Sequence, residues 1–291
     1  MISTGVRQLA PIVQIQAFSQ SRQSGNGATV VWCEKAPTTT ACQGLARQLR
    51  QSETAYLWKE AGELQIRWFT PQCEVALCGH ATLAAVIALG QWNLLEAERQ
   101  VILQSCSGPL PVAWANSPSL GLVGRIELPK GRLNNRSAEL ADSEHAELEL
   151  WLGHSIERLW GSSLGYRVAL SDTVDDLGAL RVDAGTLPET CRQGLVLMQG
   201  ASGEGFCVAG TEADYQLRFF APGLGIDEDP VTGSAHALVA DYWMAKLQRD
   251  WVVGWQPSQS CGGMRCERCD SAMIRLIGSG SVLWRGELEG F

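Results

Sequence analysis

Two glycine-led dipeptides, Gly79-His80 and Gly233-Ser234, stand where an anion could be held without much formal charge. Each opens a stretch that is predicted to be an apolar helix. The first-turn N–H groups of a helix have no intrahelical partner, and the helix dipole is positive at that end. Glycine also lets a ligand approach the backbone. Both dipeptides are therefore candidates for binding a carboxylate or an enolate-like intermediate, although either glycine could simply permit a tight turn.

Two titratable residues accompany these turns. His80 lies at a predicted helix N-terminus, where the dipole is expected to lower the pKa of the imidazole and favour the neutral form, a suitable electrophile or proton shuttle. Asp229 precedes Pro230, which restricts its backbone, so it could present a carboxylate to the same ligand. An ordinary Asp-Pro turn is the alternative. His145, His154 and His236 stand outside such motifs and are expected to be structural or exposed.

Glu53 lies at a junction between two patterns. A predicted amphipathic helix at residues 41–49 is followed by period-two alternation from Ser52 to Trp58, which is typical of a strand. Such a junction can aim a side chain into a cleft. An isolated acidic residue at this place can equally be solvated.

Asn26 belongs to a Gly-rich segment, residues 24–27, between two predicted strands at 13–18 and 28–32. Asn26-Gly27 is a strong hairpin signal because both residues tolerate positive φ. The same segment could bring backbone amides close to a ligand. Hairpin turn and ligand loop both remain open.

The ten cysteines are expected to be free thiols. Residues 1–13 lack a basic region followed by an apolar core, so no secretory signal is predicted and a reducing, cytoplasmic location is expected. Cys266 and Cys269 have the Cys-x-x-Cys spacing of half a zinc site, with Cys261 nearby, but no cysteine or histidine follows them. We therefore predict no metal site.

An internal repeat organises the elements that position these residues. Arg67-Trp68-Phe69-Thr70-Pro71 recurs as Arg218-Phe219-Phe220-Ala221-Pro222, and each copy is followed by acidic residues and a Gly-polar-Ala turn. Residues 81–89 are apolar on every face, which predicts a buried helix, and residues 234–247 form its counterpart. Strands are predicted at 64–69, 125–128, 164–170, 194–198, 206–209, 215–220 and 272–288.

Length and composition fit two similar domains. The 291 residues exceed the usual single-domain size, and the proline-rich stretch 107–124 reads as a linker, so we expect domains at 1–115 and 116–291, with the last strand able to return to the first. A net charge of −8 without a dense Lys/Arg cluster argues against nucleic acid as a partner. No apolar run reaches the ~18 residues of a membrane span. The cleft between the two copies is the expected active site.

The motifs together resemble the PhzF, or phenazine biosynthesis-like, family, in the right order over most of the chain. They are Gly25-Asn26, Ser52-Glu53-Thr54, Phe69-Thr70-Pro71, Cys78-Gly79-His80-Ala81-Thr82, Phe220-Ala221-Pro222 and Glu228-Asp229-Pro230-Val231-Thr232-Gly233-Ser234-Ala235. The chain departs from the family at Gly27, where proline is usual, and at 261–269, where Gln-Gly and Gly-Arg elements are common. The departure at Gly27 weakens the match of the first loop, and the departure at 261–269 concerns the rim of the pocket and therefore the substrate.

The resemblance implies a diaminopimelate-epimerase-like α+β fold of two pseudo-symmetric domains, each a mostly antiparallel sheet or barrel wrapped around a central helix. It implies that Glu53 is the acid/base residue, His80 the cleft histidine and Asp229 the second carboxylate. The residues expected to bind substrate are Gly79, Gly233, Ser234, Thr232 and Asn26. The implied reaction moves a proton between carbons of a small carboxylic acid without a cofactor. A raised pKa would let a buried Glu53 act first as base and then as acid.

Three functions follow as hypotheses. The first is a cofactor-independent isomerase of a small carboxylate-bearing metabolite. The second is a non-catalytic binding or interaction protein on the same fold. The third, amino-acid racemisation by two thiols, finds a candidate in Cys78 but no cysteine near Asp229 in the second copy, so Cys78 is expected to be a packed core residue. The resemblance also implies a possible homodimer.

Overall fold

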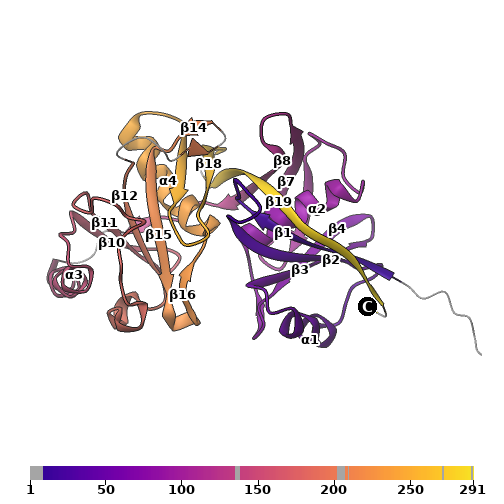
Figure 1. The fold of residues 1–291 in the computed structure, drawn as a ribbon, viewed down its shortest axis with the longest axis horizontal. Helices are drawn as coiled ribbons and strands as arrows, with labels where there is room; N and C mark the ends of the chain where they lie inside the picture. The colour runs from indigo at the N-terminus through magenta and orange to yellow at the C-terminus, as the bar shows by residue number, and fades with distance from the viewer. Residues whose placement is uncertain (1–8, 135–137, 202–206, 209, 271, 290) are drawn as a thin grey trace, which may run out of the picture. The chain divides into compact units, whose positions relative to one another are not determined.

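The computed structural model describes residues 9–134, 138–201, 207–208, 210–270, 272–289 and 291, without the side chains of 138–141. The fold is mixed α+β, and the chain divides into two compact units. Unit 1 contains the first strand together with Gly27–Ile126 and Gly278–Phe291. Unit 2 contains Ser24–Asn26 and Glu127–Ile277. Figure 1 labels the helices and strands.

Eight strands of unit 1 form a closed barrel. Strand β2 pairs in parallel with β3, and β4 with β6, while β1–β19, β3–β4, β6–β7 and β7–β8 are antiparallel. The β1–β2 and β8–β19 pairings complete the ring. The strands are β1 (Leu9–Ala17), β2 (Asn26–Trp32), β3 (Glu53–Glu60), β4 (Glu63–Phe69), β6 (Val101–Ser105), β7 (Gly108–Ser117), β8 (Gly121–Pro129) and β19 (Met273–Glu289).

Helix α2 (Gly79–Gln91) is the buried helix of this unit, as its sequence predicts. Every residue from His80 to Gly90 is buried, and the helix packs against β1, β3 and β7. Gly90 lets Trp114 of β7 lie against the helix, because a Cβ at Gly90 would come within 2.2 Å of the indole. Apolar burial on all faces explains why the helix needs no amphipathic pattern.

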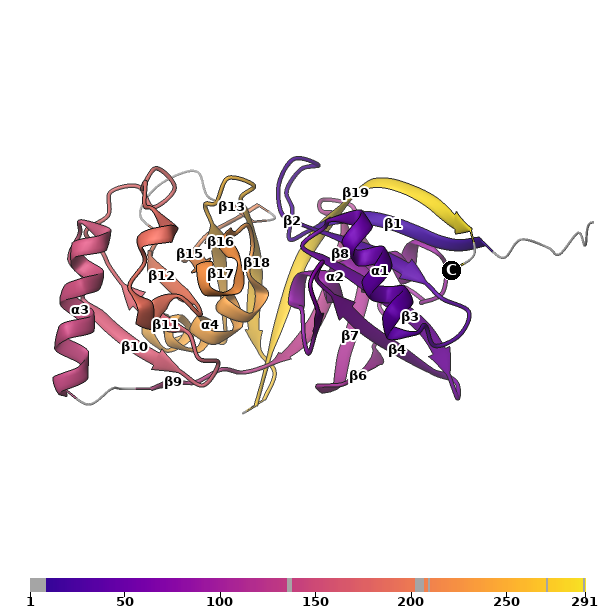
Figure 2. The ribbon, with the colours of Figure 1, turned by 90° about the horizontal axis from the view of Figure 1, so that it is seen from below.

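Helix α1 (Thr39–Leu49) is amphipathic and buries only Cys42 and Ala46. Figures 1 and 2 show it on the outside of unit 1, beside β3. Thr38 caps its first turn by accepting from the N–H of Ala41, and Arg50 ends it in a left-handed conformation. The chain then enters β3 at Glu53, so the predicted helix-to-strand junction is confirmed.

Unit 2 is built from similar parts. Its main strands pair in the order β9, β10, β11, β12, β15, β17, β18 and β19, in which β11–β12 and β15–β17 are parallel. Helix α4 (Gly233–Leu247) is mostly buried and packs against β15, β17 and β18. The strands are β9 (Leu133–Asn134), β10 (Arg158–Ser162), β11 (Arg167–Leu170), β12 (Leu195–Gly200), β15 (Tyr215–Ala221), β17 (Trp251–Gln256) and β18 (Gly262–Arg268).

The remaining elements of both units are short or peripheral. Helix α3 (Ala138–Leu152) packs Leu148 and Leu152 into a core cluster of unit 2. The short strands are β5 (Glu74–Val75), β13 (Cys207–Val208), β14 (Thr211–Glu212) and β16 (Ile226–Asp229), and the 3-10 turns are Ala184–Thr186, Glu189–Cys191 and Pro222–Leu224. Within the described residues, no helix is both long enough and apolar enough to cross a membrane.

The repeated Arg-aromatic-Phe motif has the same structure in both units. The Arg67 guanidinium pairs with both oxygens of Glu74 at 2.7 and 2.6 Å and lies over the Phe69 ring. Arg218 pairs with Glu228 at 2.7 and 2.8 Å and lies over Phe220. Each bidentate pair ties a strand to the segment that leads into the buried helix. The repeat is thus a device for placing the two helix N-termini.

Three expectations need correction. The proline-rich stretch 107–124 is not a linker, because β7 and β8 pair from Val112–Ile126 to Ser117–Gly121 as a hairpin. The chain passes from unit 1 to unit 2 at Ile126–Glu127 rather than near residue 116. Asn26-Gly27 is not the turn of a hairpin, because both residues begin β2, and the positive φ occurs at Gly25 instead.

Several elements had no prediction, among them α3, β10, β17 and β18. The strand predicted at 206–209 corresponds to β13, and its end residues Phe206 and Ala209 lie outside the described residues. The prediction that residues 1–13 carry no secretory signal also falls partly outside them, because residues 1–8 are not described.

Candidate functional site

Unit 1 brings Glu53 and His80 together at the start of α2. Nε2 of His80 lies 2.9 Å from Oε2 of Glu53 and 3.2 Å from the hydroxyl of Ser52. The Ser52 hydroxyl in turn donates to the carbonyl of Gly27 at 2.8 Å. Glu53 is the first residue of β3 and His80 the second of α2, so a strand end and a helix start supply the pair.

Cys78 completes this group. Its Sγ lies 3.4 Å from Nδ1 and 3.9 Å from Nε2 of His80. Cys78 and His80 are buried, and the Glu53 side chain is only 14% exposed. Cys78 is therefore a buried thiol, as expected, but it also contacts His80, which its assignment as a packing residue missed. Its place directly before Gly79 was the available signal.

The charges in this group differ from the expected ones. Burial raises the pKa of Glu53, but the charge of His80 and hydrogen bonds from His80, Ser52 and Cys78 outweigh it, so the pKa of Glu53 lies below its ordinary value of 4.5. The expectation of a raised pKa is wrong in direction. Glu53 is held as a carboxylate, the form that accepts a proton.

His80 shows the complementary shift. Burial lowers its pKa, but the neighbouring Cys78 and Glu53 reverse that effect, and the pKa of His80 lies well above 6.5. The predicted lowering is wrong in direction, because the neighbouring Cys78 and Glu53 raise the pKa of His80 by more than burial lowers it. Burial raises the pKa of the Cys78 thiol. The pair at rest is therefore a carboxylate beside an imidazolium.

Unit 2 collects Asp229, Thr232 and Asn26 at the start of α4. The Asp229 carboxylate accepts from Nδ2 of Asn26 at 2.8 Å and from the hydroxyl of Thr232 at 2.5 Å. Asn26 is 2% exposed and also donates to the carbonyl of Val231. Its segment is held further by the N–H of Gly25, which donates to the carbonyls of Ser260 and Cys261. Asn26 is thus a structural partner of Asp229, and it belongs to unit 2 together with Ser24 and Gly25.

Gln256, which was not predicted, binds the backbone of the segment from Asp229 to Thr232. Fully buried at the end of β17, it accepts from the N–H of Thr232 at 2.8 Å and donates to the carbonyl of Asp229 at 2.6 Å. The only sequence signal was a polar residue that ends an apolar run. Its amide fixes the backbone on both sides of Pro230 and Val231.

Neither helix N-terminus is capped by the side chain of its N-cap residue. The N-cap residue of α2 is Cys78 and that of α4 is Thr232. Neither side chain accepts a hydrogen bond from a backbone N–H of the first turn. The Thr232 hydroxyl is directed to Asp229 instead. Gly79 and Gly233 begin the two helices, as predicted, and Ser234 lies 3.4 Å from the Tyr166 hydroxyl. That the two groups act on one ligand stays a prediction.

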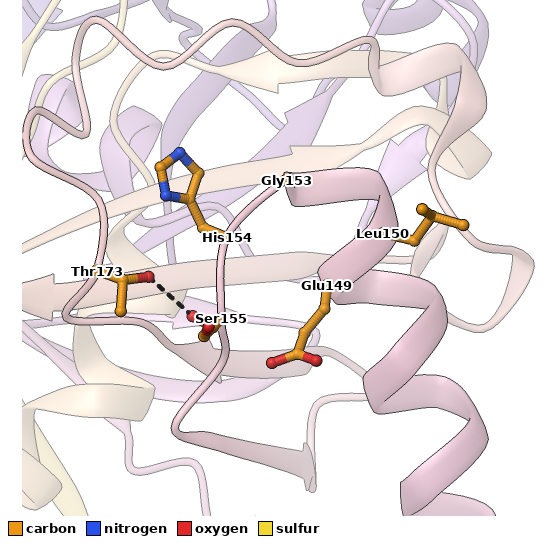
Figure 3. Close-up of a pocket in the computed structure, with 6 residues that line it drawn as sticks. All are labelled: Glu149, Leu150, Gly153, His154, Ser155 and Thr173. Atoms are coloured by element: carbon orange, nitrogen blue, oxygen red, sulfur yellow. Dashed lines mark hydrogen bonds between the residues drawn. The ribbon is translucent and has the colours of Figure 1, made fainter.

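A surface pocket and the cysteine cluster of unit 2 lie apart from these two groups. A surface pocket of about 600 Å³ lies at the end of α3, lined by Glu149, Leu150, Gly153, His154, Ser155 and Thr173 (Figure 3), and none of the predicted site residues lines it. Of Cys261, Cys266 and Cys269, Cys266 is fully buried beside the Tyr215 hydroxyl. Among the described residues, one group has metal-ligand spacing: Glu53, Cys78 and His80, whose ligand atoms lie within 4.8 Å of one another.

The architecture belongs to an epimerase-like class of α+β proteins, and solved structures show the likeness. A PhzF family protein of Enterococcus faecalis matches with a TM-score of 0.79 at 27% identity, over 97% of this chain and 99% of that chain. A hydroxyproline epimerase of Agrobacterium vitis matches with a TM-score of 0.58 at 12% identity, over 98% and 94% of the two chains. The second likeness concerns the fold alone.

Sequence comparisons identify the family. The family model described as phenazine biosynthesis-like protein matches residues 15–262. An uncharacterized isomerase of Pseudomonas aeruginosa is 32% identical over 276 residues, which cover 95% of this chain and 97% of that protein. The chain therefore belongs to the phenazine biosynthesis-like (PhzC-PhzF) family. The expected diaminopimelate-epimerase-like fold is confirmed.

Proposed function

We propose that this protein is a cofactor-independent isomerase that transfers a proton between carbons of a small carboxylate-bearing metabolite, with Glu53 as the acid/base residue. The names of its relatives and the epimerase-like fold support an isomerase or racemase type of enzyme. The observation that carries the mechanism is the Glu53–His80 contact at 2.9 Å in a nearly dry environment.

The first step is proton removal by Glu53. Its carboxylate is ionised, and its Oε2 lies in a mostly buried place 2.9 Å from Nε2 of His80. A carboxylate oxygen in this state can accept a proton from an acidic C–H of the substrate. Adjacent Ser52 and His80 hold the side chain in place and limit its rotamers.

The second step returns the proton to another carbon. Once Glu53 is protonated, the nearby positive charge of His80 favours loss of that proton and so drives its delivery to the new carbon. The same charge stabilises negative charge that develops on the substrate. The uncapped N-terminus of α2 adds N–H groups and a positive dipole end for the substrate carboxylate.

Asp229 is proposed as the second carboxylate of the mechanism, and Thr232, Gly233, Ser234, Gly79 and Asn26 as residues that hold or surround the substrate. Asn26 and Thr232 act mainly through Asp229, since both donate to its carboxylate. A two-thiol racemase is less suited to this arrangement, because Asp229 and Thr232 occupy the place in the second copy where that mechanism needs a cysteine.

Deuterium exchange tests the proposal. The protein is incubated in D2O with a panel of small carboxylic acids, and deuterium in the acids is followed by NMR. We expect at least one acid to gain deuterium at carbon, with a rate that falls by about 10²- to 10⁴-fold in Glu53→Gln. The matched control is Glu60→Gln, an exposed carboxylate on the same strand. Full-rate exchange in Glu53→Gln would refute the role of Glu53, and tight binding without exchange would favour a binding protein.

A further inference from the structure

We propose that Glu53, Cys78 and His80 form a site for a zinc-type divalent cation, and that the bound ion inhibits the enzyme. The inhibition rests on the proposed function, whereas the binding does not. The three residues offer a carboxylate oxygen, a thiol sulfur and an imidazole nitrogen, all within 4.8 Å of one another.

Two of the three ligand separations are close to those around a small ion, and the third is within 4.8 Å. Ligands at about 2.0 to 2.3 Å from a tetrahedral zinc ion lie roughly 3.3 to 3.7 Å from one another. Nε2 of His80 lies 2.9 Å from Oε2 of Glu53 and 3.9 Å from Sγ of Cys78. Changes of about half an ångström in these two separations, in opposite directions, reach the tetrahedral range.

The donor set selects the type of cation. A thiolate with an imidazole favours zinc and its neighbours in the transition series over magnesium or calcium, which prefer oxygen ligands only. Burial of Cys78 and His80 removes water that would compete for the ion. Three protein ligands leave the fourth tetrahedral position open for water or a small anion.

Binding changes the protonation of the group. The Cys78 thiol must lose its proton and His80 must bind the ion through a neutral nitrogen, so the protons of S–H and of the imidazolium pass to solvent. The product is a carboxylate, a thiolate and a neutral imidazole around the ion, with two negative charges to balance its two positive ones. No oxidant or reductant is involved.

Occupancy and proton transfer exclude each other. The Glu53 oxygen that would accept the substrate proton donates its lone pair to the ion instead. Bound zinc should therefore lower the rate of deuterium exchange into the substrate.

Cobalt is the probe for the site, because a cobalt–thiolate bond gives a charge-transfer band in the near ultraviolet. The full-length protein is titrated with Co2+, and bound Zn2+ is measured separately by equilibrium dialysis. We expect a thiolate band that Zn2+ abolishes by displacement. Cys78→Ser should lose this band, and Glu53→Gln should keep the thiol but bind at least about tenfold more weakly.

The matched control is Cys106→Ser, because Cys106 is an exposed free thiol of the same unit, and it should retain the band. Thermal melting shows that each variant is folded, and Glu53→Gln tests the site without altering any cysteine. The inference fails if the band persists in Cys78→Ser, or if Co2+ and Zn2+ do not bind to a protein that exchanges deuterium. Binding by a protein that exchanges no acid would instead leave the site standing and refute the proposed function.

Discussion

Oε2 of Glu53 and Nε2 of His80 lie 2.9 Å apart, although one residue begins a strand and the other begins a buried helix. The contact lowers the pKa of the carboxyl and raises that of the imidazole, so each group holds the other in its charged form. A carboxylate kept ionised beside an imidazolium is the central feature of the candidate site.

This pair should make stability depend on pH in a defined way. Because the pKa of Glu53 is lower in the folded protein, its contribution is present above its ordinary 4.5 and is lost as the pH falls through the folded value. The pKa of His80 is raised, so its contribution is complete below 6.5 and is lost as the pH rises through the higher folded value.

The stability difference between wild type and Glu53→Gln should therefore be largest between pH 4.5 and 6.5 and should decline on either side. Urea denaturation from about pH 3 to about pH 9 measures it. A difference that is constant over this range would contradict the ion pair. Glu60→Gln, on the exposed end of β3, serves as the control.

Asn26→Asp should destabilise unit 2. The new carboxylate would face the Asp229 carboxylate and the Val231 carbonyl, both of which accept hydrogen bonds from the Asn26 amide. A buried charge without a partner costs about 3 kcal/mol or more. Chemical denaturation at neutral pH measures the loss, and the difference should shrink in acid, where the new carboxyl is protonated. Wild-type stability in Asn26→Asp would rule out this arrangement.

Gln256→Glu should disturb the start of α4. The change keeps an acceptor for the N–H of Thr232 but removes the amide that donates to the Asp229 carbonyl. We expect a loss of roughly 2 to 4 kcal/mol in unfolding free energy, because a buried oxygen then faces a carbonyl. Hydrogen exchange of the first-turn amides of α4 should accelerate more than that of α2. Equal acceleration in both helices would argue against a local role.

Gly90→Ala should destabilise unit 1 by about 1 to 3 kcal/mol through overpacking. The added methyl would meet the Trp114 indole, whose Nε1 donates to the Leu95 carbonyl and restrains the ring. Gly44→Ala is the matched control in helix α1, where a Cβ meets nothing within 4 Å, and it should stabilise by roughly 0.5 to 1 kcal/mol. Thermal melting of both variants tests whether Gly90→Ala lowers and Gly44→Ala raises the stability of the protein.

Local patterns in the sequence were enough for the central features of the fold. The apolar run at 81–89 could only be a buried helix, and the repeated Arg-aromatic-Phe motif marked two related halves. Glu53, His80 and Asp229 were selected by motif resemblance. The inferences about the helix and the two halves succeed because periodicity and motif spacing act over short stretches of chain, whereas the roles of the three site residues stay predictions.

The tertiary structure decided which side chains meet and what charge they carry. Cys78 and Gln256 join their groups only because separate elements bring them within hydrogen-bond distance of His80 and Thr232. The pKa of His80 rises rather than falls, since the effects of the neighbouring Cys78 and Glu53 exceed that of burial. The linker predicted from the composition of residues 107–124 is likewise wrong, because their prolines lie in or beside paired strands. Contacts between distant residues, and the electrostatics that depend on them, are properties of the folded chain and not of any local pattern.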